Sequence, residues 1–156
     1  KPMTQIQLEV SNQYNRLNSP ELMTRALFEA IERSEKFPIE PGDLSVVFVS
    51  DEQISEIHAK FLDIETPTDV ITFQADTKMQ SAGEIIVSVD HALSRAKELN
   101  VCFSRELCLY LLHGWLHLSG YDDQSESERV KMRTAEQEAF AILDKAQLTE
   151  AFTLGS

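Results

Sequence analysis

The chain has 156 residues, a formal net charge of −12 at pH 7 and a hydrophobic content of 42%. This length suits one domain that buries roughly 70% of the surface of its unfolded chain. The acidic balance argues against non-specific nucleic-acid binding over the whole surface, because phosphate contacts supply most of that affinity. No apolar run approaches the roughly 20 residues of a membrane span, and no signal-peptide pattern opens the chain. We therefore expect a cytoplasmic protein without a membrane partner.

Helix starts are marked by capping residues. Ser19 is expected to cap a helix whose first residue is Pro20, because proline is favoured at the first helical position. Leu22 belongs to the apolar stripe expected on that helix. Ser50 and Ser125 each stand three residues before a Gln or Glu, which is the capping-box signature. These signals predict helices that begin near residues 20, 51 and 126.

Strands are indicated by two hydrophobic patterns. Residues 5–10 alternate apolar and polar side chains, as a half-buried strand does, whereas residues 44–49 form a continuous apolar run typical of a strand buried on both faces. Asp90 is expected to cap the helix after the last strand. In chain order we expect strand 5–10, helix 20–36, strand 44–49, helix 51–61, strands 70–73 and 84–89, and helices 91–100, 104–118 and 126–143.

The order β-α-β-α-β-β-α-α-α predicts the α+β class. We expect one domain over residues 1–150, with a mixed sheet of about four strands covered by helices, and a loose tail over residues 151–156. The segment 107–112 is apolar on every side of its helix. This helix should therefore be buried.

The segment 113–123, with the sequence HGWLHLSGYDD, is the most informative part of the chain. His113 and His117 stand one helical turn apart, with Cβ atoms roughly 5–6 Å from each other, so that both imidazoles can bind one metal ion. Gly120 lets the chain turn back and bring a carboxylate to them. Two solvated or hydrogen-bonded histidines are the alternative interpretation, but the glycine turn and the carboxylate ten residues after His113 favour a metal site.

The same segment resembles the signature HGxLHLxGYDH of the YbeY family of bacterial metal-dependent endoribonucleases, in which three histidines hold a zinc ion. Residues 67–73, PTDVITF, are similar to the family segment PTDVLSF, and residues 83–85, GEI, to its GDI segment. The resemblance covers essentially the whole domain, and it implies the α+β fold of that family.

The resemblance implies that His113, His117 and Asp123 hold one Zn²⁺ or another divalent transition metal, and that they act in catalysis through it. Asp123 replaces the third histidine of the family, and a carboxylate oxygen binds zinc at nearly the same distance as an imidazole nitrogen. Asp122 is the competing ligand, but it aligns with a family aspartate that does not bind the metal. We expect Asp122 and Asp69 to contact the ligands rather than the metal.

As a function, the resemblance implies a metal-dependent endoribonuclease that acts in 3′ end maturation of 16S rRNA and in ribosome quality control. The implied partners are rRNA or the small ribosomal subunit and ribosome-associated proteins, with no DNA. Gly114 stands where HExxH metalloproteases carry their glutamate base, so that protease mechanism lacks its base.

One departure leaves alternatives open. Leu62 aligns with a family arginine that is considered important for RNA cleavage. Because the arginine is absent and the chain is acidic, two other functions are alternatives. One is a zinc-dependent hydrolase of another phosphoester, and the other is a ribosome-associated binding module with structural zinc. The pattern assigns no RNA-binding residues; the nearest basic candidates along the chain are Lys60, Arg95, Lys97, Arg105 and Arg129.

Overall fold

A computed structural model of the chain describes residues 5–62 and 69–155. The first two residues of the PTDVITF segment, 67 and 68, and the side chain of Leu62 lie outside this part. The predicted order of strands and helices is confirmed, with one added 3₁₀ turn. The elements are β1 (Ile6–Asn12), α1 (Glu21–Ser34), β2 (Gly42–Val49), α2 (Asp51–Leu62), β3 (Val70–Phe73), η1 (Thr77–Met79), β4 (Ser81–Ser88), α3 (Val89–Leu99), α4 (Phe103–Leu118) and α5 (Glu126–Lys145).

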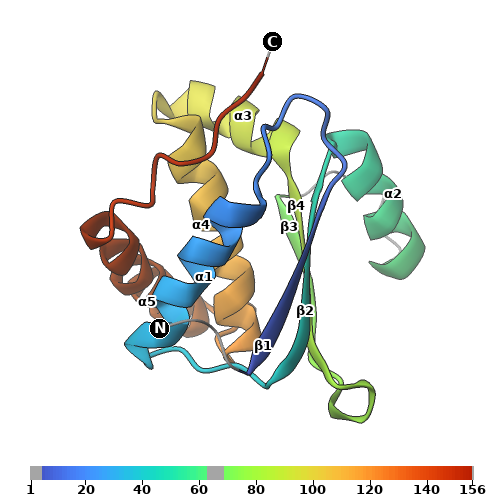
Figure 1. Cartoon of the computed structure of the whole chain (residues 1–156), viewed down its shortest axis with the longest axis vertical. Helices are drawn as coiled ribbons and strands as arrows, with labels where there is room; N and C mark the ends of the chain where they lie inside the picture. Colours follow the sequence, from blue (N-terminus) through green and yellow to red (C-terminus); the bar gives the residue numbers. More distant parts are fainter. Residues whose placement is uncertain (1–4, 63–68, 156) are drawn as a thin grey trace.

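The strands form one mixed sheet in the order β1-β2-β4-β3. β1, β2 and β4 run parallel, and β3 pairs antiparallel with β4 at one edge. Helices α1, α4 and α5 cover one face of the sheet, and α2 lies on the other face (Figure 1). The predicted α+β class and four-stranded mixed sheet are confirmed. Within the described residues, no helix combines the length and the apolar character that a membrane crossing requires.

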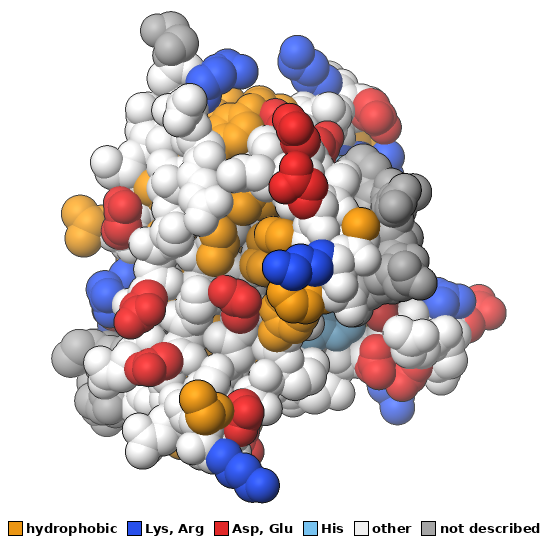
Figure 2. Space-filling view, turned by 90° about the vertical axis from the view of Figure 1, so that its right-hand side faces the viewer, with side chains coloured by type: hydrophobic (Ala, Val, Ile, Leu, Met, Phe, Trp, Pro, Cys, Tyr) orange, Lys and Arg blue, Asp and Glu red, His pale blue; other side chains and the backbone are white. Residues whose placement is uncertain are grey.

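The two faces of the sheet bury very different amounts of apolar surface. The main core lies under α1, α4 and α5, and its largest fully buried side chains include Trp115, Phe28 and Phe48. The α2 face holds only a small cluster around Ile54 and Ile71. Over it, buried and half-buried apolar side chains with the exposed Phe61 line a groove of about 360 Å³, on a face where Figure 2 shows hydrophobic side chains gathered. The main core is therefore what fixes the position of α4.

Helix α4 is held in one rotation by close packing, and its predicted burial is confirmed. A Cβ at Gly114 would lie 2.6 Å from Cγ2 of Ile85, so glycine allows the helix to approach β4 directly. Trp115 is 1% exposed, and its Nε1–H donates to the carbonyl of Phe37 at 2.8 Å. With Gly114 and Trp115 fixed in the core, His113 and His117 remain half-buried at its margin.

Helix α1 begins one residue later than expected. Pro20, not Ser19, occupies the N-cap, and its carbonyl accepts both the N–H and the hydroxyl of Thr24. This satisfied hydroxyl can be buried, so Thr24 faces the core while Leu22, expected on the apolar stripe, is 78% exposed. The helix is therefore rotated relative to the predicted stripe.

Two further expectations differ from the structure. Ser88, not Asp90, caps α3, because the strand ends at Ser88 and its hydroxyl accepts the N–H of His91. The tail expected to be loose over residues 151–156 is packed across its described part, residues 151–155. Phe152 is buried and donates its N–H to the hydroxyl of Ser104, and Leu154 pairs with Leu17.

Candidate metal centre

The end of α4 and the turn after it bring three side chains together. His113 and His117 lie one turn apart on α4. Gly120 has a φ of +107°, in the left-handed region that favours glycine, and the N–H of Tyr121 returns to the carbonyl of Leu116. The reversed chain carries Asp123 back over the two imidazoles.

The donor atoms of these three residues form a nearly regular triangle. The Nε2 atoms of His113 and His117 lie 3.1 Å apart, and each lies 3.5 Å from Oδ2 of Asp123. Zinc bonds of about 2.0–2.2 Å place neighbouring donors of a tetrahedral site about 3.3 Å apart. The triangle therefore has the size that one zinc ion requires, and it brings together the three residues that the sequence picks out as ligands.

The electrostatics of the triangle also fit a cation. When both rings are neutral and carry their proton on Nδ1, two imidazoles and a carboxylate direct lone pairs at one point. Nitrogen and oxygen donors in this combination suit zinc and other divalent transition metals. The side chains of His113, His117 and Asp123 are 22%, 20% and 37% exposed, so the open side of the triangle remains accessible to water and substrate.

Glu136 supports the site from α5, and the sequence analysis did not find it. Its Oε2 lies 2.6 Å from Nδ1 of His113, and its side chain is 17% exposed. Burial alone would lower the pKa of His113, but the hydrogen bond and the charge of Glu136 outweigh it, and the pKa is raised. A proton on Nδ1 that Glu136 accepts leaves the lone pair of the neutral ring on Nε2, which is the tautomer that a metal-binding histidine uses.

The two supporting residues expected from the sequence lie close to the ligands and outside the triangle. Oδ1 of Asp122 accepts the N–H of Asp123 at 2.8 Å, which fixes the ligand's backbone. Asp69 lines a hollow of about 220 Å³ next to His113. Arg129 adds a contact from α5, because its guanidinium donates to the carbonyl of Asp123 at 3.3 Å.

Comparisons with known proteins identify the family. The family model described as "Endoribonuclease YbeY" matches residues 6–144. A protein of that name from Acholeplasma laidlawii is 34% identical over 138 residues, which covers 88% of this chain and 96% of the relative. The protein of the same name from Lachnoclostridium phytofermentans is 32% identical over a match that covers 92% of this chain and 98% of the relative.

A solved structure extends the comparison to the fold. The solution structure of a Thermotoga maritima protein superposes with a TM-score of 0.61 at 25% identity, covering 93% of this chain and 97% of that one. The resemblance drawn from the motif is thus confirmed at the level of sequence and fold. The chain belongs to the endoribonuclease YbeY family.

Proposed function

We propose that this protein is a metal-dependent endoribonuclease with a zinc ion held by His113, His117 and Asp123. The observation that carries the proposal is the convergence of three donor atoms within 3.5 Å of one another. They converge in a chain whose curated relatives are named endoribonucleases. His113 and His117 supply neutral nitrogen donors, and Asp123 supplies the one negative charge among the three ligands.

The chemistry of the site suits phosphodiester hydrolysis. When bound, zinc polarises a phosphoryl oxygen and makes water a nucleophile at neutral pH. Glu136 keeps the ring of His113 in one tautomer, and Asp122 keeps the backbone of Asp123 in place. In an HExxH peptidase, a glutamate directly after the first histidine is the general base. Gly114 occupies that position here, so this base is missing.

The substrate and setting form the finer part of the proposal. Membership of the family supports 3′ end maturation of 16S rRNA and ribosome quality control, in the cytoplasm, with the small ribosomal subunit and its associated proteins as partners. Because the net charge of −12 repels phosphate overall, RNA must be bound at a local basic surface.

The proposal is tested with purified protein loaded with zinc and a single-stranded fragment of rRNA. Cleavage should stop when a chelator removes the metal and return when zinc is added back. His117→Ala should abolish both zinc binding and cleavage, whereas His58→Ala, on α2 at the other face of the sheet, should leave both intact.

Two results would contradict the proposal. If the zinc-loaded protein leaves RNA intact but hydrolyses a different phosphoester, the protein is a hydrolase with another substrate. A wild-type protein without any hydrolytic activity, whose His117→Ala variant loses stability and ribosome binding together, would identify a binding module with structural zinc.

A further inference from the structure

Two hollows next to the metal centre adjoin each other. The hollow beside His113 has a volume of about 220 Å³, and a second one of about 320 Å³ lies between α4 and α5. Both are lined by Glu106, Leu109 and Glu136, of which Glu136 holds His113. The two hollows therefore share a wall, and the first of them reaches His113. Together we call them the α4–α5 groove; it is defined by His113, Arg95, Leu109, Arg133 and Phe140.

The floor of the α4–α5 groove is apolar and accessible. Leu109 and Phe140 are half-buried, and Val101 at one end is 45% exposed. Arg105 stacks on the ring of Phe140 at 4.6 Å and pairs with Asp144 at 2.8 Å, so its guanidinium is held over the floor. Flat apolar surface with a stacked guanidinium is the kind of platform on which nucleobases pack.

Two other arginines have charges that remain available to a ligand. Among the residues that the structure describes, Arg95 pairs with Glu98 alone, at 3.1 Å, and both side chains are exposed (49% and 65%), so this ion pair is weak. Arg133 makes no ion pair with any residue in the described part of the chain. Arg95 lines the end of the groove beside His113, and Arg133 lines the part between the helices.

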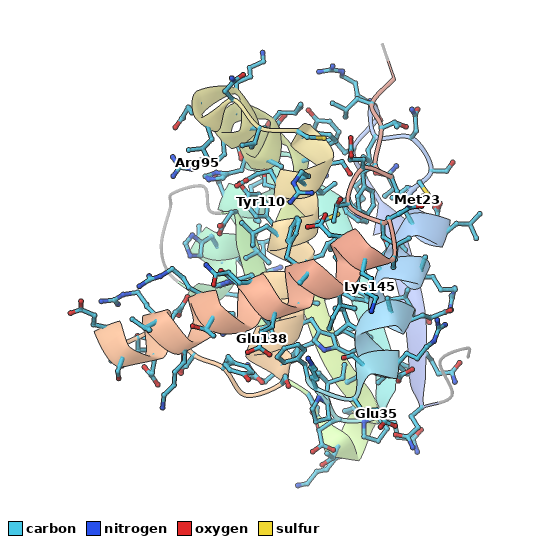
Figure 3. All side chains as sticks on the ribbon, turned by 90° about the vertical axis from the view of Figure 1, so that its left-hand side faces the viewer. Met23, Glu35, Arg95, Tyr110, Glu138 and Lys145 are labelled. Atoms are coloured by element: carbon cyan, nitrogen blue, oxygen red, sulfur yellow. The ribbon has the colours of Figure 1, made fainter. Side chains whose placement is uncertain are left out.

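The groove also carries acidic residues, namely Asp69, Glu106 and Glu136. Glu136 is bound to His113, Oδ1 of Asp69 accepts the N–H of Val70, and burial together with the nearby Glu106 raises the pKa of Tyr110. Figure 3 shows Arg95 and Tyr110 on the same side of α5, with Lys145 at the far end of that helix. Arg95 and Arg133 are the basic residues of the groove whose side chains are exposed to a ligand.

We propose that the α4–α5 groove binds the single-stranded RNA segment that adjoins the cleaved phosphodiester. Arg95 and Arg133 each contact a phosphate, and bases pack on the floor formed by Leu109 and Phe140. The inference rests on the proposed nuclease function, and it names the path of the substrate toward the metal. The chemistry selects single strands, because only unpaired bases expose their faces to an apolar floor.

The test measures steady-state cleavage of a single-stranded RNA by zinc-loaded protein at several salt concentrations. Arg95→Gln and Arg133→Gln should each raise KM about three- to tenfold and change kcat less than about twofold, since the lost contact binds substrate away from the cleaved bond. With two phosphate contacts, log(kcat/KM) should fall with log salt with a slope of about −1.4, and each variant should reduce the slope to about −0.7.

Lys145→Gln removes the same charge at the far end of α5 and is the matched control; its KM and slope should equal those of the wild type. If wild-type protein cleaves RNA but Arg95→Gln and Arg133→Gln behave like Lys145→Gln, the groove is not the RNA path and the nuclease function stands. If zinc-loaded wild-type protein neither binds nor cleaves RNA, the nuclease function and the groove assignment fail together.

Discussion

The molecule contains two clusters of polar side chains that differ in how their hydrogen bonds are satisfied. In the Asp90 network (Tyr14, Asp51, Ser88 and Asp90), the hydroxyl of Tyr14 and the N–H of Asp51 donate to the two carboxylate oxygens of Asp90. The hydroxyl of Ser88 donates to Asp51 at 2.7 Å. In the candidate metal centre, by contrast, two imidazole nitrogens and a carboxylate oxygen face each other across 3.1–3.5 Å.

The difference separates a structural cluster from a binding cluster. Each carboxylate of the Asp90 network meets a protein donor, so the network is complete without a ligand and joins the loop after β1 to the starts of α2 and α3. The two imidazole nitrogens and the carboxylate oxygen of the candidate metal centre face one common point instead of separate protein donors. The convergence of three possible ligand atoms on one point, rather than the mere gathering of polar residues, is the arrangement that suits a metal ion.

The largest expected effect comes from removing one of these acceptors. Asp123→Ala leaves two histidines, and we expect the affinity for zinc to fall by more than about 100-fold, beyond the loss typical of a supporting hydrogen bond. Asp123→His should restore most of the affinity, because imidazole and carboxylate reach zinc at similar distances. Competition with a chromophoric chelator measures both.

Asp122→Ala is the matched control for Asp123, since it removes the neighbouring carboxylate and only the contact to the Asp123 N–H. Its zinc affinity should fall much less than that of Asp123→Ala. If Asp122→Ala fails to bind zinc while Asp123→Ala still binds it, the third ligand is Asp122 and not Asp123.

A smaller effect is expected for the residue that orients a ligand. Glu136→Gln keeps the shape but removes the charge that faces Nδ1 of His113, and we expect zinc affinity to fall about 10–100-fold. Glu138→Gln, exposed on the same helix, removes an equal charge and should leave the affinity unchanged. Equal affinities of the two variants would show that Glu136 does not orient His113.

The local part of the metal centre could be predicted from the sequence, and its long-range part could not. His113, His117 and Asp123 lie within eleven residues, and helix periodicity with a glycine turn is enough to bring them together. Glu136 reaches His113 only because α5 packs on α4, and it is one of several acids along an amphipathic helix. Periodicity places Glu136 beside the apolar stripe of α5, but it does not show that His113 lies opposite.

The same distinction explains the errors in the fold. Ser88 and Asp90 are both good capping residues, and the choice between them depends on where β4 stops pairing with β2. The end of the chain has the composition of a tail, but Phe152 packs on Phe48, whose ring centroid lies 6.0 Å away on a strand a hundred residues earlier. Contacts of this range leave no local pattern.

The smallest expected effect tests the independence of the Asp90 network. Burial and the hydrogen bond to Asp90 raise the pKa of Tyr14 from 10.0 to about 12. The folded state therefore holds this proton more tightly than the unfolded state does, so the stabilisation is complete below pH 10 and is lost as the pH rises from 10 to 12. Tyr14→Phe removes this hydrogen bond, and we expect the free energy of unfolding to fall by about 1 kcal/mol at pH 7.

Urea denaturation at pH 7 and at pH 11 measures both effects. The loss of stability between the two pH values should be smaller in Tyr14→Phe than in the wild type; Tyr110, whose pKa is raised by burial and by Glu106, still contributes a part. Tyr121→Phe is the control, because its hydroxyl bonds to no residue in the described ranges. Zinc affinity should stay constant in both variants. A Tyr14→Phe protein that loses zinc along with stability would mean that the two clusters are coupled, and that a complete hydrogen-bond network does not by itself mark a purely structural role.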